Sequence, residues 1–248
     1  MKFKPFFILL IILLLLPLSC CFAETQSIPM LIAKQTNGTV SYSLSIKILA
    51  VMALLTILPA LLITMSAFTR IIIVLAILRQ AIGIPSVPSN QILIGLSLIM
   101  TLFVMMPFLQ NINDRGIQPY LDGKLTEMQA VNESANAIKT FMLKQTRKAD
   151  LRAFTELSKV KFNSDSNYSL LVIMPAFLTS ELKTAFEIGF LIFLPFLIID
   201  LVIASILMSM GMMMLSPMVI SLPFKLLFFV LVNGWSLIVV SLITSFRI

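Results

Sequence analysis

Charged side chains lie within or at the edges of apolar segments that are long enough to cross a lipid bilayer. They are Arg70, Arg79, Glu181, Lys183, Glu187, Asp200 and Lys225. A charge at the centre of a bilayer costs at least about 2.5–3.5 kcal/mol, so these side chains are expected to face other protein or water. Two kinds of chemistry are compatible with them: ion pairing between the subunits of an assembly, or a proton relay.

Histidine does not occur in the sequence, and its two cysteines are Cys20 and Cys21. The lack of histidine excludes Ser-His-Asp and Cys-His nucleophiles and any imidazole-bound metal, and it weakens the proton relay. The cysteines fall in a segment expected to be removed, so the mature chain is predicted to have no disulfide and no thiolate zinc site. The catalytic candidates are then Glu181, Glu187 and Asp200, without a base or metal ligands around them. We therefore expect neither an enzyme nor a cofactor or metal.

Methionine is concentrated in one short segment. Six of the 16 methionines lie within 208–218, namely Met208, Met210, Met212, Met213, Met214 and Met218. Gly211 and Pro217 interrupt the helical pattern and predict a turn there. Thioether side chains are unbranched, polarizable and able to repack around irregular partners. Two interpretations remain open: packing at the tip of a hairpin, or a deformable seal, formed by the first five of these methionines, around something that moves.

The composition places these residues in a membrane protein. Hydrophobic residues make up 59% and charged residues 12% of the 248, whereas soluble domains average about 25% charged residues. The net charge is +7, but most charges lie in the polar region 110–168, where basic and acidic residues are interleaved. This mixed pattern is typical of a solvated surface and not of nucleic-acid binding. We predict an all-α membrane protein with one polar insert and no nucleic-acid partner.

Hydropathy and turn signals divide the chain into five segments. These are a cleavable signal peptide (1–23), a polar lead (24–46), a first membrane helical hairpin (47–109), a polar, mostly helical periplasmic insert (110–168) and a second membrane helical hairpin (169–248) that contains the methionine-rich turn 208–218. Spans in the second hairpin are expected at roughly 187–209 and 218–241. In the insert, five apolar residues recur at helical spacing and predict one buried face: Met128, Val131, Ala135, Ile138 and Met142.

Prolines interrupt nearly every apolar run. They are Pro59, Pro107, Pro175, Pro195 and Pro223. Each removes a backbone donor and is expected to bend or break its helix. In lipid, broken helices are tolerated where they pack against protein or line a cavity. Together with the charges, the prolines predict helical hairpins that bury against one another in an oligomeric assembly.

The most distinctive stretches are PAFLTSELKTAFEIGF at 175–190 and PFLIIDLVIAS at 195–205, with FTRIIIVL at 68–75, MGMMML at 210–215 and SLPFK at 221–225. Together they resemble the FliP family of membrane subunits of the flagellar type III export gate. The resemblance implies a homo-oligomer assembled with FliQ and FliR, and with other flagellar export apparatus proteins, in contact with membrane lipid. It places this assembly at the basal body in the bacterial inner membrane. It also implies a channel for unfolded flagellar proteins that the methionine-rich turn closes.

Two alternative functions remain open. An injectisome type III secretion homologue would share these motifs, but such homologues generally lack a signal peptide, so the signal peptide favours the flagellar branch. A small-solute secondary transporter would need a binding site near the bilayer midplane and usually internal repeats, and the sequence shows neither.

The amino terminus yields a first testable prediction. Lys2 and Lys4, the leucine-rich run after them and the small residue Ala23 predict that the signal peptide is removed and that the mature chain begins at Glu24. Amino-terminal sequencing of the membrane-inserted protein should therefore read from Glu24, and a retained Met1 would contradict the prediction.

Overall fold

The computed structural model describes residues 43–158, 168–212 and 214–246. The expected signal peptide, its cleavage point between Ala23 and Glu24, and most of the polar lead lie outside these residues. Internal contacts divide the chain into two units, residues 1–56 and 57–248. The described part of the first unit is the beginning of helix α2 (Ser43–Thr64). The remaining helices belong to the second unit.

Every regular element in the described part of the chain is helical, as the sequence predicts. After α2 the helices are α3 (Phe68–Ile82), α4 (Asn90–Ile112), a π-helical segment η2 (Asn113–Ile117), α5 (Gln118–Leu121), α6 (Glu127–Gln145), α7 (Lys148–Ser158), α8 (Leu170–Ser209), α9 (Pro217–Leu231) and α10 (Gly234–Thr244). The expected insert thus corresponds to the end of α4, η2, α5, α6 and α7.

Two of these helices are long and apolar enough to cross a membrane. They are the continuous run Asn90–Leu121, which contains α4, η2 and α5, and α8 at Leu170–Ser209. Helices α9 and α10 would form a third span if they cross together, although they are bent by 64° at the break between them. The second hairpin therefore differs from the expected spans, because α8 begins well before residue 187 and the following span is divided.

The five prolines do not break their helices. They lie inside α2, α4, α8 and α9, and each helix continues through its proline. A proline removes one backbone donor, and the neighbouring turns of a long helix keep theirs. The break in the second hairpin occurs instead at Asn233, whose backbone is left-handed with φ 51° and ψ 48°. Asparagine adopts this conformation more readily than most residues, because its short polar side chain can bond locally.

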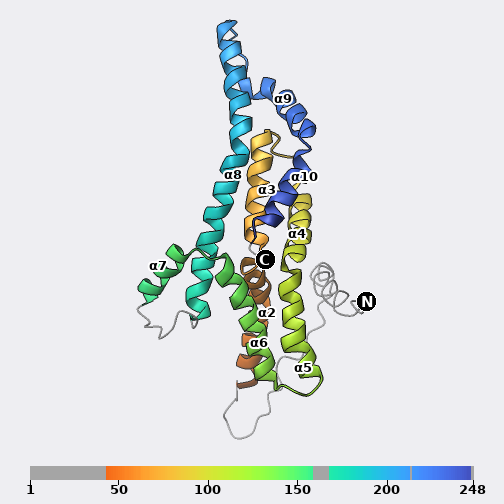
Figure 1. Cartoon of the computed structure of the whole chain (residues 1–248), viewed down its shortest axis with the longest axis vertical. Coiled ribbons are helices and arrows are strands. Elements are labelled where there is room, and N and C mark those ends of the chain that lie inside the picture. The colour runs from red at the N-terminus through yellow and green to blue at the C-terminus, as the bar shows by residue number, and fades with distance from the viewer. Residues whose placement is uncertain (1–42, 159–167, 213, 247–248) are drawn as a thin grey trace. The chain divides into compact units, whose positions relative to one another are not determined.

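Helix α3 forms the centre of the second unit. It packs against α8, α4 and α9, and Figure 1 shows it between α8 and α4. Ile71, Val74, Leu75 and Leu78 on α3 are completely buried, at the spacing of one and two helical turns. The residues of α3 between these four are partly buried as well, which explains why the segment between Arg70 and Arg79 is a continuous apolar run.

Aromatic side chains attach the polar insert to the apolar helices. The ring of Phe141 on α6 lies 4.9 Å from that of Phe108 on α4 and 5.9 Å from that of Phe177 on α8, measured between ring centroids. Phe141 and Phe177 are completely buried. Edge-to-face aromatic pairs contribute about 0.5–1.5 kcal/mol of stability beyond the effect of the area they bury. These ring contacts therefore hold α6 against α4 and α8.

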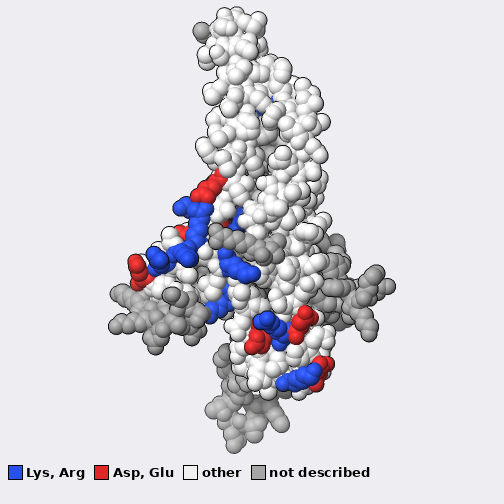
Figure 2. All heavy atoms as spheres, viewed as in Figure 1, with Lys and Arg blue, Asp and Glu red and all other residues white. Residues whose placement is uncertain are grey.

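Charged and apolar surfaces are separated along the second unit. Figure 2 shows the charged side chains of the visible face over α5, α6, α7 and the neighbouring part of α8, while the surface over the end of α8 and over α9 carries almost none. The exposed side chains there are large and apolar, among them Leu201, Ile206, Val219 and Leu227. Such a surface requires lipid or other protein against it.

Helices α3 and α8 are in close contact at a glycine of α8. A Cβ atom added at Gly189 on α8 would lie 2.5 Å from Cδ1, 3.1 Å from Cγ2 and 3.3 Å from Cβ of Ile77 on α3. Gly95 on α4 offers a contrast, because nothing lies within 4 Å of an added Cβ there.

These two glycines allow a matched test of the α3–α8 contact. Alanine is favoured over glycine inside a helix by about 1 kcal/mol, so Gly95→Ala should raise the thermal midpoint of the detergent-solubilised protein. Gly189→Ala should lower it, because overpacking costs typically about 1–3 kcal/mol. Circular dichroism during heating measures both midpoints. If the two variants are stabilised alike, α3 and α8 are farther apart at Gly189 than the distances to Ile77 indicate.

Candidate functional site

A completely buried ion pair joins α3 to α8. Nε of Arg70 donates to Oε2 of Glu181 at 2.8 Å, and its Nη2 donates to Oε1 at 2.5 Å. The two residues are 2% and 0% exposed. This paired geometry matches the planar fork of a guanidinium to both oxygens of a carboxylate, which is the strong form of the interaction. The sequence singled out both residues but did not indicate that they pair with each other.

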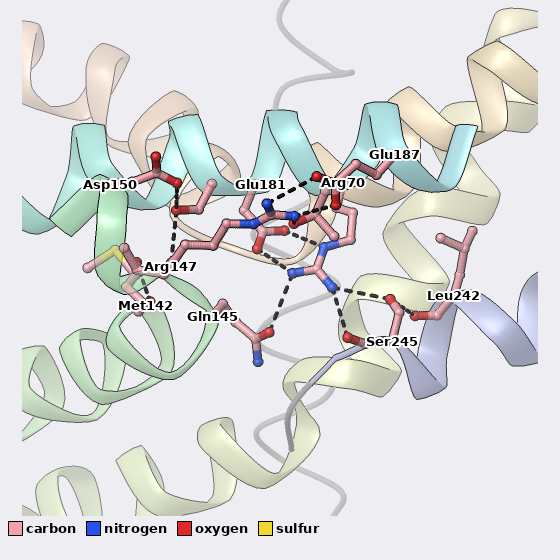
Figure 3. Close-up of polar contacts among 12 residues, drawn as sticks. Arg70, Met142, Gln145, Arg147, Asp150, Glu181, Glu187, Leu242 and Ser245 are labelled. Carbon is pink, nitrogen blue, oxygen red and sulfur yellow. Dashed lines mark hydrogen bonds and ion pairs between the residues drawn. The ribbon is translucent and has the colours of Figure 1, made fainter. Parts of the chain in front are cut away.

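The same guanidinium collects partners from two further parts of the chain. Nη1 of Arg70 donates to the backbone oxygen of Ser245 at 3.1 Å and to its Oγ at 3.2 Å, and Nη2 donates to Oε1 of Gln145 at 3.4 Å. The ring of Phe246 lies 4.0 Å from the guanidinium carbon. Figure 3 shows Gln145, at the end of α6, and Ser245, after α10, beside Arg70. One side chain thus holds α3, α6, α8 and the end of α10 together.

A second ion pair joins α8 to α9, and its lysine also caps the carboxyl end of α3. Nζ of Lys225 on α9 lies 2.6 Å from Oδ2 of Asp200 on α8, and Ser221 donates its hydroxyl to the other carboxylate oxygen at 2.5 Å. Nζ of Lys225 also donates to the backbone oxygen of Ala81 at 3.2 Å. That oxygen belongs to the last turn of α3, where a cation is favoured by the helix dipole. Lys225 is 2% exposed, so its charge is neutralised within the chain.

A third group attaches the insert to α8. Arg147, in the connection between α6 and α7, forms an ion pair with Glu187 and also donates to Oγ1 of Thr184 at 3.3 Å. Its backbone N–H donates to Oγ of Ser180 at 3.0 Å, and Ser180 donates in turn to Oδ2 of Asp150 at 2.7 Å. The bond to Glu187 raises the pKa of Arg147, against the smaller opposing effect of burial. The insert is therefore docked on one polar face of α8.

The remaining predicted charges have different positions. Arg79 donates to Oδ1 of Asn90 at 2.6 Å and to the backbone oxygen of Pro88 at 3.3 Å. These bonds hold the end of α3 to the connection that leads into α4. Lys183 is exposed, and Glu187, four residues further on, pairs with Arg147. Within the described residues, no group of three or more histidine, cysteine, aspartate or glutamate side chains is arranged to hold a metal ion.

The sequence did not indicate which polar side chains would meet the predicted charges. Those it missed include Gln145, Arg147, Ser221 and Ser245. Arg147 appeared only as one of many charges in the polar region, and an uncharged partner in a helix has no distinguishing sequence signal. These ion pairs lie within one chain, whereas the sequence left open pairing between subunits or a proton relay. The physical reason is that α3, α8 and α9 pack directly against one another and bring opposite charges together.

The methionine loop, residues 208–218, begins with a specific end to α8. Gly211 is left-handed with φ 75°. Its amide donates to the carbonyl of Met208 at 3.0 Å, and the amide of Met212 donates to the carbonyl of Leu207 at 3.0 Å. This pattern is the Schellman motif, which glycine accommodates without strain. The side chains of Leu207 and Met212 occupy the positions that commonly touch in this motif; Leu207 is buried and Met212 is partly buried.

The other described methionines of this loop are exposed. Met208 is 65% and Met210 63% exposed, and Met214 is fully exposed. Met213 lies outside the described residues. Because these side chains extend away from the rest of the chain, filling gaps within it is not their role. Residues 210–216 connect α8 to α9, and Figure 1 shows that connection at the far end of α8 from α7.

Comparison with known proteins assigns the sequence to a family. The sequence model of the FliP family matches residues 51–242, which include both buried ion pairs and the methionine loop. The chain belongs to the FliP family. The expected resemblance is therefore confirmed.

Several FliP-family relatives are similar over most of their length. The flagellar biosynthetic protein FliP of Cereibacter sphaeroides is 53% identical over 216 residues, which cover 87% of this chain and 71% of the relative. That of Bacillus subtilis is 50% identical over 82% of this chain and 93% of the relative. That of Agrobacterium fabrum is 42% identical over 98% of this chain and 99% of the relative. The shared name associates this FliP-family chain with the flagellar export apparatus.

The two glutamates of α8 allow a matched test of the buried pair in this FliP-family chain. Glu181→Ala leaves the guanidinium of Arg70 buried without its carboxylate, which typically costs about 3–5 kcal/mol. Glu187→Ala removes an exposed carboxylate from the same helix and should change stability little. Thermal unfolding of the detergent-solubilised variants, with the yield of folded protein, compares them directly. Equal decreases in thermal midpoint would show that the Arg70–Glu181 pair contributes no more to stability than the exposed Glu187.

Proposed function

We propose that this chain is a core channel subunit of the flagellar type III protein export gate in the bacterial inner membrane. Copies of it assemble with FliQ and FliR at the basal body and conduct unfolded flagellar proteins. The membrane-capable helices and the names of the relatives support the setting. In this proposal the insert lies in the periplasm, and the methionine loop is the closed-state seal.

The observation that carries the proposal is the exposed, uncharged methionine loop at the end of a 40-residue helix. Exposed thioethers are costly in water unless another surface covers them. Identical loops arranged around a symmetry axis would cover one another and form a ring of apolar, flexible side chains. Each methionine has three rotatable bonds and no branch, so such a ring excludes ions when closed and still deforms around a passing chain.

The distribution of charge supports assembly. Arg70, Glu181, Lys225 and Asp200 are neutralised within the chain. The outer surface of α8 near them is apolar, with Phe186, Phe190 and Leu191 exposed. Assembly therefore uses apolar surface, and the charged pairs act on it indirectly, because they fix the helices that present this surface.

The seal is tested by a fourfold substitution. Met210→Ala, Met212→Ala, Met213→Ala and Met214→Ala together shorten the side chains of the loop without adding charge. We expect the complex to copurify with FliQ and FliR as the wild type does, because the ion pairs lie elsewhere. We also expect cells that contain the assembled variant to leak ions, measured as membrane conductance or growth at high salt.

A control variant replaces exposed methionines outside the loop, with Met52→Ala, Met106→Ala and Met128→Ala. These changes also remove apolar surface, and they should cause no leak. A fourfold loop variant that assembles and remains as tight as the wild type would refute the sealing role. A control variant that leaks equally would show that the leak comes from general loss of packing.

A further inference from the structure

In the single chain the methionine loop also contains thioethers that are open to oxidants, and in the proposed ring those that face the channel remain within reach of an oxidant as small as hydrogen peroxide. Met208 and Met210 are 65% and 63% exposed, and Met214 is fully exposed. Met100, Met105 and Met142 in the interior are 3%, 9% and 0% exposed. Oxidation of methionine to its sulfoxide follows exposure of the sulfur. The chain therefore contains a set of oxidisable thioethers and an internal set that is protected.

We propose that the methionine loop is a reversible oxidation site, at which a peroxide or hypohalous acid converts thioethers to sulfoxides and thereby opens the seal. The second part of this inference rests on the sealing role proposed above, whereas the first part does not. Met212 is partly buried, although its neighbours Met210 and Met214 in the loop are exposed. Met212 should therefore oxidise more slowly than Met214.

The chemistry needs no group from the protein other than the sulfur. A lone pair of the thioether sulfur attacks one oxygen of hydrogen peroxide, an S–O bond forms, the O–O bond breaks and water leaves after proton transfer. The sulfur is oxidised by two electrons and the peroxide is reduced by two. A methionine sulfoxide reductase reverses the reaction: the sulfoxide oxygen leaves as water, and two thiols become a disulfide.

The consequence follows from the polarity of the product. A sulfoxide oxygen is a strong hydrogen-bond acceptor, and burying it without a donor is unfavourable. Residues 208–218 contain no charged residue, lysine and arginine included, so the loop itself supplies few side-chain donors. Sulfoxides in a ring of such loops would draw in water. Met128 on α6 is 71% exposed and should oxidise as readily, but it lies on the polar insert, where a sulfoxide has no effect on a seal.

The first experiment uses the full-length protein purified in detergent and treated with hydrogen peroxide. Peptide mass spectrometry locates each added oxygen, a gain of about 16 Da per sulfoxide. We expect gains at Met208, Met210, Met214 and Met128 well before Met100, Met105 or Met142. Sulfoxide reductases with a dithiol should remove them. Oxidation of the interior methionines at the same rate as the loop would overturn the oxidation site.

The second experiment uses cells that contain the assembled complex and measures ion leak after a brief oxidant exposure. One variant replaces all six methionines of the loop, Met208, Met210, Met212, Met213, Met214 and Met218, with leucine, which keeps the loop apolar and removes every thioether from it. The matched control is Met128→Leu. We expect oxidant-induced leak in the wild type and in the control, and its loss in the leucine loop.

The two proposals fail in distinguishable ways. If loop sulfoxides form but the wild type and the leucine loop leak alike after oxidant, oxidation does not open the seal. The sealing role still stands in that case if the fourfold alanine variant leaks without oxidant. If that alanine variant is tight, the sealing role itself is refuted, and the mass-spectrometric result alone decides whether the loop is an oxidation site.

Discussion

The rest of the second unit depends on the ion pair between Arg70 and Glu181. A guanidinium has five N–H donors in a fixed plane, and here they meet a carboxylate on α8, an amide at the end of α6 and a backbone oxygen after α10. Such a pair adds little net stability over an apolar contact of the same shape, because both charges must leave water. It fixes direction instead, since any rotation of α3 or α8 would leave a buried charge without its partner.

Helix α8 makes polar contacts with three other parts of the chain. Ser180, Thr184 and Glu187 hold the insert, Glu181 holds α3, and Asp200 holds α9. Asp200 and Met208 are eight residues apart, about 12 Å along a helix. The end of α8 therefore extends beyond its last ion pair, with the Schellman turn to reverse the chain. This arrangement combines a helix held by several polar contacts with an exposed tip, the combination that the proposed seal requires.

The sequence predicted the helical class, the residues of both buried pairs and the methionine-rich turn, because charges in apolar runs and clustered methionines are unusual. It did not predict which charges meet, since pairing depends on how α3, α8 and α9 pack. It wrongly suggested breaks at prolines such as Pro195, because local propensity takes no account of the neighbouring turns through which α8 continues past them. The predicted face of α6 is buried only towards its end: Met142 is completely buried, whereas Met128 is exposed.

The inward placement of charge determines what kind of partner the outer surface can select. Lys225 and Asp200 satisfy each other and the end of α3, so they offer no net charge to a molecule that packs against the outer surface. The apolar side chains of α8 and α9 then meet lipid and protein on nearly equal terms, because lipid tails are as apolar as leucine. Selectivity for protein must come from shape, and shape is what the buried pairs maintain. A chain with weakened pairs would still be apolar, but it would present α8 and α9 at angles that fit lipid as well as any protein.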